Sequence, residues 1–523
     1  MARSHPVSPV DDADEPPWVR RIAIALIGVT IVVGWGPRLF WGLGLDETFS
    51  VWQVDSGLGA IARDKLGNPG QSVLFAYIEA LFYFPSSRHM EVWLRVPSLM
   101  GALLSCVLVH RLAALLVARR VALVAVIALV GSPQMIIYST QARPYALAVA
   151  ACLAALWGLL RFLDGGRRLH GLCFAVSMAA AIHLHFMFVL FAIVPAFLVL
   201  RRVQREPGRA WRGLLGWCGL TVLLVLPLAP MARTLSRRTD LAFQPMPGFA
   251  QLGAACLPVV ILTSLIAFLV LFVRDRRNAL AGLQGSSVRP VRELAILWLL
   301  APPLALFVGS YVFGQSMLIE RYCLHTVAAE ALLVATLFRA FSPRVAKLAL
   351  LAGSVPLAAY QGIQAWSLRD SPTGWRRPLQ TIAATDPGAA AAVFLQAGHP
   401  MSNGMDWEHA LPARSFLYSP IAAYPVPNRV YPLPYDADEK MRAYVRRLAD
   451  TELRAAPTIF LVGVIQHPTN EWIRMFFESR GYASTYAVPQ GICLVVMRKV
   501  APDPPPITPA HTELGTARPA IGL

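Results

Sequence analysis

Residues 22–50 read IAIALIGVTIVVGWGPRLFWGLGLDETFS, an apolar run that leads into the acidic pair Asp46-Glu47. The run is long enough to cross a bilayer, which needs about 20 mostly apolar residues. Two neighbouring carboxylates beside a membrane span are costly to remove from water, so they require solvent, a cation or a chemical role. Because few other acids fall near the same predicted membrane face, the pair is the first candidate for catalysis.

The composition places the chain among polytopic membrane proteins. Of its 523 residues 56% are hydrophobic and only 15% are charged, whereas a soluble domain averages about 25% charged residues. The net charge of +17 comes from short basic clusters between apolar runs, as in membrane-protein loops, and does not indicate a nucleic-acid partner. The seven cysteines lack the spacing of a metal site, and they predict no disulfide framework.

The apolar runs predict about eleven spans. They lie at about 20–41, 92–112, 121–138, 145–163, 169–183, 185–200, 213–231, 252–273, 293–313, 322–341 and 345–363. Basic clusters fall in alternate connections, so the positive-inside rule predicts a cytoplasmic N-terminus and a C-terminal part outside. Residues 1–19 form the cytoplasmic tail, and without a cleavable signal the first span is expected to act as an uncleaved anchor.

The parts predicted to lie outside are a long first loop and a C-terminal domain. The loop, residues 42–91, is expected to hold an interfacial helix at 49–65 and an apolar dip at 73–84. Within 364–500, short apolar runs alternate with amphipathic ones, which predicts a small α/β domain. Residues 501–523, rich in Pro, Thr and Ala, are expected to be disordered. The predicted fold class is an α-helical polytopic protein, residues 20–363, with this extracytoplasmic domain attached.

Polar residues gather at the predicted outside ends of several spans. Besides the acidic pair they are Gln141, Arg143, Tyr145, His183, His185, Glu320, Arg321 and Tyr322. Topology alone brings them to one face, which is what an active site built on span ends requires. Arginine suits a phosphate because its planar guanidinium stays charged and binds oxygens in pairs. A carboxylate suits a general base that takes a proton from a hydroxyl group.

Together these groups favour displacement on a sugar that is joined to a lipid phosphate. A phosphate leaving group needs positive charge but no strong acid, so one base is enough, unlike the two carboxylates of glycoside hydrolysis. Attack by an activated hydroxyl in one step inverts the anomeric centre. We expect Asp46 to be the base, with Glu47 orienting it or binding a cation, because side chains of neighbouring residues diverge by about 100° on a helix.

The order of these motifs resembles the bacterial GT-C glycosyltransferases of the glycosyltransferase 39 type. The resemblance covers residues 20–363 and rests on Asp46-Glu47 after the first span, the turn Ser139–Tyr145 and the late Arg321-Tyr322. That group is akin to protein O-mannosyltransferases and aminoarabinose transferases. It implies a catalytic acid at Asp46, a polyprenyl-phosphate sugar as donor, and phosphate contacts from Arg143 and Arg321, with Tyr145 and Tyr322 beside them.

The same resemblance implies a bacterial cytoplasmic membrane protein that modifies a glycan, lipid or protein acceptor. One departure is Asn68-Pro69-Gly70-Gln71-Ser72, where many members carry a stretch like His-Pro-Pro-Leu. The histidine that is often near the site is therefore missing. This leaves the acceptor contacts and the use of a divalent metal open.

Each signal also has a structural interpretation. Acids are favoured at helix N-termini, so the acidic pair also suits the start of an interfacial helix. Arginines at span ends commonly reach toward lipid headgroups, and tyrosines there form aromatic belts. His183 and His185 also fit interfacial positions on opposite sides of a link, and Glu320 also fits a simple ion pair with Arg321.

Two other functions fit a basic polytopic chain. A transporter or flippase of lipid-linked glycans should carry acids or helix breaks near the membrane midplane, and the spans here hold few of them. A non-catalytic scaffold of an envelope polysaccharide complex would leave the acidic pair and the arginines dispensable. Polymerases that join lipid-linked oligosaccharides share the donor chemistry and form a third, closer alternative.

Overall fold

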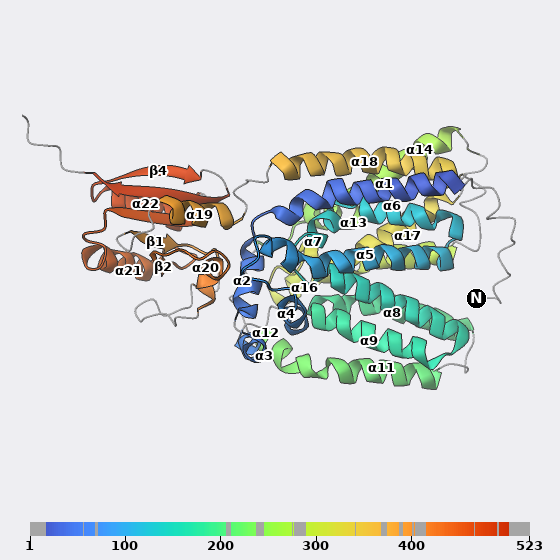
Figure 1. The fold of residues 1–523 in the computed structure, drawn as a ribbon. Helices are drawn as coiled ribbons and strands as arrows, with labels where there is room; N and C mark the ends of the chain where they lie inside the picture. Colours follow the sequence, from blue (N-terminus) through green and yellow to red (C-terminus); the bar gives the residue numbers. More distant parts are fainter. Residues whose placement is uncertain are drawn as a thin grey trace, which may run out of the picture.

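The computed structural model describes residues 17–55, 57–67, 72–205, 211–236, 245–274, 276, 289–339, 341, 343–367, 374–385, 391–399, 402, 415–464, 466–488 and 491–500. Two parts are visible in Figure 1, a long helical bundle and a smaller domain with a sheet at one end of it. The predictions of a cytoplasmic tail and of a disordered segment at 501–523 fall almost wholly outside the described residues, as does Asn68-Pro69-Gly70-Gln71.

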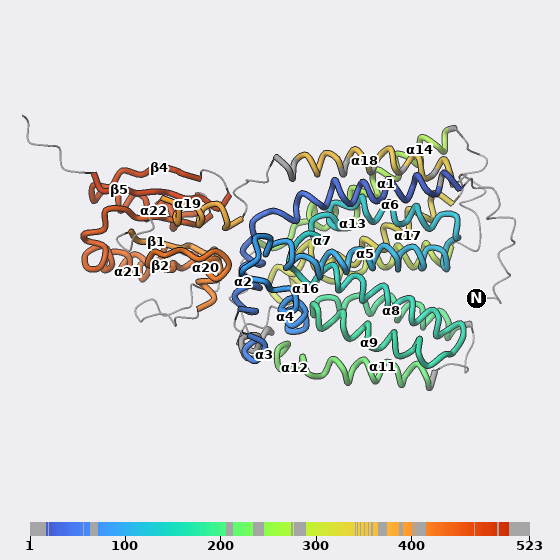
Figure 2. The backbone as a smooth tube through the Cα atoms, viewed as in Figure 1, coloured from blue at the N-terminus to red at the C-terminus, as the bar shows by residue number. Residues whose placement is uncertain are grey.

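The bundle is built from apolar helices. They are α1 (Pro17–Trp35), α5 (Met90–Leu116), α6 (Ala122–Val130), α7 (Pro133–Ser139), α8 (Tyr145–Gly165), α9 (Arg168–Leu184), α10 (Ile193–Arg205), α11 (Trp211–Val225), α12 (Ala229–Ser236), α13 (Phe249–Cys256), α14 (Val259–Arg274), α16 (Arg289–Phe313), α17 (Thr326–Phe338) and α18 (Pro343–Ser367). Most run along the long axis of the bundle, as the tube in Figure 2 also shows.

Each of the eleven predicted spans coincides with one or two of the described helices. Not all of these segments are long and apolar enough to cross a membrane as a single helix. Six are long and apolar enough to cross a membrane, and eight are if each of two bent pairs counts as one span. The bends lie between α6 and α7, at 67°, and between α13 and α14, at 57°. The other segments are α9 and α17, which are shorter, and α18. The chain is a multi-pass membrane protein.

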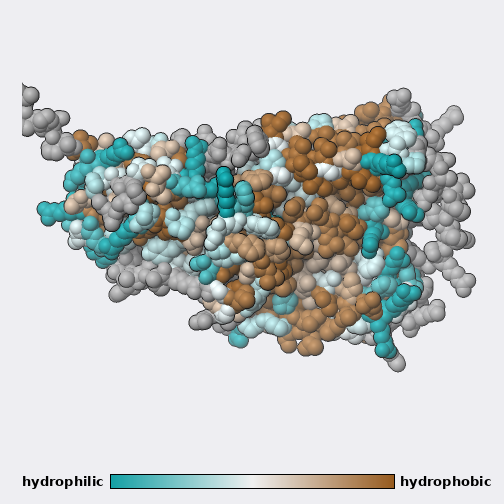
Figure 3. Space-filling view, viewed as in Figure 1, coloured by the Kyte–Doolittle hydropathy of each residue, from teal (hydrophilic) through white to brown (hydrophobic). Residues whose placement is uncertain are grey.

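The surface of the bundle matches a membrane environment. In Figure 3 apolar side chains cover its middle, and polar ones gather at the end opposite the small domain. Basic residues of several connections make contacts there: Arg344 lies over the ring of Trp18 in α1, and Arg120 donates to the carbonyl of Arg339. This is the charge pattern on which the predicted cytoplasmic orientation depends.

The first long loop forms three short helices at the other end of the bundle. These are α2 (Leu45–Val54), α3 (Leu58–Gly67) and α4 (Val73–Ala80). The predicted helix over 49–65 is therefore two helices, and the first begins four residues earlier than expected. In Figure 1 α2 lies between the bundle and the small domain. The acidic pair consequently lies in the first turn of a helix that contacts both parts.

The C-terminal domain contains a five-stranded mixed sheet of order β2-β1-β3-β5-β4. Strands β2 (Arg429–Pro432), β1 (Ala392–Leu395) and β3 (Thr458–Val464) are parallel, whereas β5 (Ile492–Lys499) is antiparallel to β3 and to β4 (Tyr482–Val488). The predicted apolar runs are β1, β3 and β5. The short β2 and the largely exposed β4 lack such a run, so the sequence pattern did not predict them.

Helices cover both faces of this sheet. Leu379 and Ile382 of α19 (Arg376–Thr385) pack with Val393 of β1 in one apolar cluster. Met441 of α21 (Glu439–Asp450) and Ile473 of α22 (Pro468–Glu478) pack with neighbouring strand residues in another. Because successive residues of a strand face opposite sides, the two clusters lie on opposite faces. The predicted α/β character of the domain is confirmed.

Glu91 of α5 links the domain to the bundle. Its Oε1 accepts from Arg376 at 3.2 Å and from the Tyr424 hydroxyl at 3.0 Å. The same hydroxyl accepts from the backbone N–H of Leu43 at 2.9 Å. Nearby, a Cβ on Gly374 would lie only 2.7 Å from the backbone of Gly42, so the chains touch directly there. The segment before α2 is therefore held from both sides.

Candidate active site

The helix α2 begins at a capped N-terminus. Gly44 precedes it in an extended conformation, and its backbone N–H donates to Glu47 Oε2 at 2.9 Å. An acid three residues into a helix commonly closes the first turn in this way. The local sequence Gly-Leu-Asp-Glu therefore fixes the start of the helix. It also sets the directions of the Asp46 and Glu47 side chains, which diverge as the sequence predicted.

Glu47 is buried in an ion pair. Its Oε1 and Oε2 each accept from the Arg95 guanidinium at 2.9 Å, and Oε1 also accepts from the backbone N–H of Ala142 at 2.8 Å. The side chains of Glu47 and Arg95 are only 7% and 2% exposed. Arg95 also donates to carbonyl groups before α2, those of Arg38, Leu39, Trp41 and Gly42. Glu47 thus joins α2 to the 140–145 turn and is closed to an acceptor.

Asp46, in contrast, keeps 46% of its side chain exposed. Its Oδ2 lies 3.3 Å from Arg143 Nη2 and 3.6 Å from Arg321 Nη1. Within the described part of the chain, no hydrogen bond engages Oδ1. Burial would raise the pKa of Asp46, but the charges of Arg143 and Arg321 outweigh it, so the pKa lies below its usual value. The carboxylate is ionised at neutral pH and has one oxygen open.

Arg143 is held in place by the turn that carries it. Its backbone carbonyl accepts from the Ser98 hydroxyl at 2.7 Å, and its guanidinium donates to the Asp46 carbonyl at 3.1 Å and to the Tyr145 hydroxyl at 3.2 Å. Its side chain is 6% exposed. Burial would lower the pKa of Arg143, but Asp46 and Tyr145 outweigh it and raise the pKa. Arg143 is a permanently charged group with a fixed direction.

Arg321 is the more open of the two arginines. It lies on the short 3-10 helix η6 (Glu320–Cys323), and its side chain is 25% exposed. Its Nε is buried and has no hydrogen-bond partner among the described residues. A buried N–H without a partner costs about 1–3 kcal/mol, so such a group calls for an explanation, such as a bound ligand. The arginine therefore has a donor to offer an anion.

His185 is the centre of an aromatic cluster beside the arginines. Its ring lies 5.2 Å from that of Tyr145 and 4.9 Å from that of Tyr322. Burial, together with the charges of Arg143 and Arg321, lowers the pKa of His185 to about 3, so the ring is neutral at pH 7. Its Nδ1 has no hydrogen-bond partner in the part of the chain that the structure describes. Of the predicted polar contacts, His185 is the one that reaches this cluster.

The other three predicted contacts have different surroundings. His183 points elsewhere, with Nε2 2.9 Å from the carbonyl of Leu224. Gln141 contributes a backbone carbonyl that accepts from the Arg143 N–H at 2.8 Å, and Glu320 is exposed at the start of η6. Among the described residues, no group of three or more His, Cys, Asp or Glu side chains is placed to hold a metal ion. The use of a divalent metal, which the sequence left open, is therefore a question for experiment.

Four residues near the site were not predicted. Arg95 and Glu79 are charged residues inside apolar stretches, a signal that the sequence did offer. Glu79 is fully buried and adds to the raised pKa of Arg143. Gln53 is also fully buried, and neither of its amide atoms has a described partner; it follows Asp46 by seven residues, two turns along the same helix face. His399 comes from the C-terminal domain, and no sequence pattern connects it with α2.

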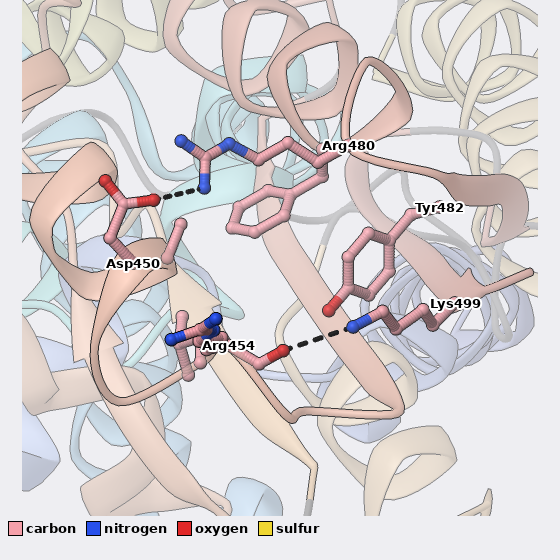
Figure 4. Close-up of a pocket in the computed structure, with 8 residues that line it drawn as sticks. Asp450, Arg454, Arg480, Tyr482 and Lys499 are labelled. Carbon is pink, nitrogen blue, oxygen red and sulfur yellow. Dashed lines mark hydrogen bonds and ion pairs between the residues drawn. The ribbon is translucent and has the colours of Figure 1, made fainter.

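A cavity of about 510 Å³ in the C-terminal domain is a separate feature. Figure 4 shows Arg480 beside Asp450 and Lys499 beside Arg454. Arg480 pairs with Asp450 at 2.5 Å, and Lys499 donates to the Arg454 carbonyl at 3.2 Å. All lining residues come from α21, α22, β4 and β5 or their ends, and none from α2, the 140–145 turn or η6. The cavity is not part of the Asp46 site.

Comparison with known proteins supports a role in glycosyl transfer. Residues 71–231 match the dolichyl-phosphate-mannose-protein mannosyltransferase family. No curated protein matches the chain. The structure is similar to that of ArnT from Cupriavidus metallidurans bound to undecaprenyl phosphate, at 12% identity and a TM-score of 0.55 over 92% of this chain and 98% of that one. The apo form of that ArnT gives a TM-score of 0.53 at 12% identity over the same shares.

A third likeness, to the oligosaccharyltransferase of Archaeoglobus fulgidus, has a TM-score of 0.40 at 14% identity over 91% of this chain and 73% of that one, and no argument depends on it. The resemblance in the sequence and the predicted fold class are confirmed. The chain has the fold of ArnT, and its residues 71–231 match the dolichyl-phosphate-mannose-protein mannosyltransferase family.

Proposed function

We propose that the protein is an inverting glycosyltransferase that moves a sugar from a polyprenyl-phosphate donor to an acceptor hydroxyl. The observation that carries this proposal is the position of Asp46, a half-exposed carboxylate between two arginines from distant parts of the chain, at 3.3 Å from Arg143 and 3.6 Å from Arg321. The open Oδ1 suits a general base, and the guanidinium groups suit a phosphate.

In the proposed reaction the acceptor oxygen attacks the anomeric carbon as Asp46 takes the hydroxyl proton. The new bond joins the acceptor oxygen to the anomeric carbon. The bond between that carbon and the phosphate oxygen breaks, and its electron pair stays on the phosphate. The products are the glycosylated acceptor, with inverted configuration, and polyprenyl phosphate, and the proton on Asp46 passes to water when the site opens.

The charges of the site favour the leaving group. Asp46, Arg143 and Arg321 together carry a formal charge of +1 when all are ionised. The donor phosphate has one negative charge and gains another as the bond to the sugar breaks. Fixed positive groups beside that oxygen therefore stabilise the transition state more than the ground state. The unpartnered Nε of Arg321 fits this role, and the hydroxyls of Tyr145 and Tyr322, which lie beside the two arginines, offer further hydrogen bonds.

The membrane setting agrees with a lipid donor. The apolar bundle would hold the polyprenyl chain between its helices, with the phosphate at the end where α2 lies. The similar fold of ArnT was solved with undecaprenyl phosphate, which supports a ligand of this class. Under the positive-inside rule this end lies at the outer face of a bacterial cytoplasmic membrane. Glycans, lipids and proteins all carry hydroxyl groups that could accept the sugar.

The test is the release of polyprenyl phosphate by purified protein from a panel of polyprenyl-phosphate sugars, with cell-envelope acceptors and with or without divalent metal. Loss of a general base typically costs about 10²–10⁴ in rate, so Asp46→Asn should lower release to that extent. Asp55→Asn is the matched control, since Asp55 lies on the same loop but its side chain bonds only to the Tyr83 hydroxyl among the described residues. Absence of release from every donor would favour the transporter or scaffold alternatives.

A further inference from the structure

The C-terminal domain reaches the first turn of α2 through the segment that follows β1. In this segment Gly398 has a positive φ of 82°, which turns the chain back toward the bundle. A Cβ at Gly398 would lie 3.5 Å from Leu45 Cδ2, so the backbone packs against the residue next to Asp46. His399 follows directly and is 93% buried, with 7% of its surface exposed.

The ring of His399 packs beside the helix face that carries Asp46. Its centroid lies 5.8 Å from that of Phe49 and 5.1 Å from that of Phe416, both edge-on. Phe49 follows Asp46 by three residues, and residues at this spacing are neighbours on a helix surface. Aromatic contacts from both parts of the protein therefore hold the imidazole on the side of α2 that carries Asp46.

The two ring nitrogens of His399 differ in their surroundings. Nε2 lies 3.4 Å from the Ser419 hydroxyl, and the backbone carbonyl of His399 accepts from the Ser402 hydroxyl at 2.6 Å. Nδ1 has no partner in the described ranges of the chain. Burial lowers the pKa of His399 to about 4, although Asp46 acts in the opposite direction. The ring is neutral at pH 7 and can bind a hydroxyl group without competing for the phosphate.

We propose that His399 binds a carbohydrate acceptor by hydrogen bonding through Nδ1 to the hydroxyl next to the one that Asp46 deprotonates. This inference rests on the proposed transferase function and assigns the acceptor side of the same site to the C-terminal domain. A sugar presents a second hydroxyl beside the reacting one, whereas a serine or threonine side chain does not. Phe416, which is half-buried, offers an apolar surface to the sugar ring.

The test separates transfer from cleavage of the donor. Purified full-length protein is given a polyprenyl-phosphate sugar that it cleaves, first with water as the only acceptor and then with octyl glycosides of several sugars or with a Ser/Thr-rich peptide. His399→Phe keeps the aromatic packing and removes both nitrogens. We expect about a tenfold fall in kcat/KM for the best glycoside, the scale of one lost hydrogen bond, with donor hydrolysis and donor KM unchanged.

Two substitutions distinguish the nitrogens. The amide of asparagine reaches the position of Nδ1 and that of glutamine the position of Nε2, so His399→Asn should retain most glycoside transfer and His399→Gln should not. His467→Phe is the matched control, because His467 is in the same domain and packs against Tyr435, with ring centroids 4.6 Å apart. It should behave as wild type.

Equal loss of hydrolysis and transfer in His399→Phe, unchanged transfer, or transfer only to the peptide would each overturn the assignment. Failure of the proposed function has a different result, since the wild-type protein would then release no polyprenyl phosphate from any donor. The two failures are therefore distinguishable before any His399 variant is measured.

Discussion

Glu47 and Arg95 form a buried, two-pronged ion pair in which each carboxylate oxygen accepts a hydrogen bond of 2.9 Å. The pair fixes the start of α2 against the second apolar helix of the bundle, and so determines where Asp46 stands. Asp46 and Glu47 are neighbours in sequence, yet the Glu47 side chain is buried and the Asp46 side chain is half-exposed. The acidic pair thus combines an anchor with a candidate base.

The Glu47–Arg95 ion pair should contribute measurably to the stability of the protein. Glu47→Gln leaves the Arg95 charge buried without a counter-charge, and breaking such a pair typically costs about 3–5 kcal/mol. We expect a clear fall in the apparent Tm of the detergent-solubilised protein. Glu439→Gln is the control, because that exposed pair with Arg446 should contribute less than about 1 kcal/mol. The double variant Glu47→Gln, Arg95→Met should recover part of the loss; if it does not, the charge pair is not the cause.

Arg321 should contribute to donor binding as well as to the chemical step. A hydrogen bond to a charged group contributes about 1.5–3 kcal/mol, so Arg321→Ala should weaken the apparent donor affinity by about ten- to a hundredfold. The variant should also have a lower kcat, measured at saturating donor, because the leaving phosphate loses a positive neighbour. Arg344→Ala is the control at the opposite end of the bundle, where Arg344 lies over Trp18. An unchanged donor KM in Arg321→Ala would refute the phosphate role.

The two arginines should also set the pH dependence of the reaction. Because they lower the pKa of Asp46, the base stays ionised down to below the usual aspartate range near 3.9, and kcat/KM should be constant through neutral pH. Arg143→Gln or Arg321→Gln should move the acid limb upward, by about 1–3 units for a close arginine. A pH–rate profile of donor cleavage measures this shift.

The stability of the protein should fall on the acid side, in the same direction as its activity. Since the folded pKa of Asp46 is lowered, the stability that its ion pairs contribute is present above the unfolded pKa and is lost as pH falls through the folded one. Acid limbs at the same pH in the wild type and in both glutamine variants would contradict the assignment of Asp46 as the titrating base.

The sequence predicted the bundle and the residues around Asp46 because both follow from local signals. Apolar runs mark helices, and alternate basic connections sort the span ends to two faces. Arg143 and Arg321 were accordingly expected near Asp46, and the structure brings them within 3.3 and 3.6 Å. The ion pair of Glu47 was not predicted, because its partner Arg95 lies inside an apolar run.

His399 could not be predicted for a different reason. Its contact with α2 depends on how the C-terminal domain docks on the bundle, through Glu91, Arg376 and Tyr424, and no periodicity or spacing encodes that arrangement. His183 and His185 were both predicted at the outside end of a span, with positions on opposite sides of a link as an alternative. In the structure the backbone changes direction between them, and the two rings have different partners.

The docking contacts give the last prediction. The Tyr424 hydroxyl donates to Glu91 and accepts from the Leu43 N–H, just before α2. Tyr424→Phe removes both bonds and leaves that N–H without its partner, so the C-terminal domain and the start of α2 should loosen together. We expect faster hydrogen exchange in residues 43–55 and a lower rate of transfer to the acceptor. The rate of donor hydrolysis should change less. Tyr486→Phe is the control, since its hydroxyl bonds to Glu471 on the domain surface. Faster exchange confined to the C-terminal domain would mean that Tyr424 does not couple it to the site.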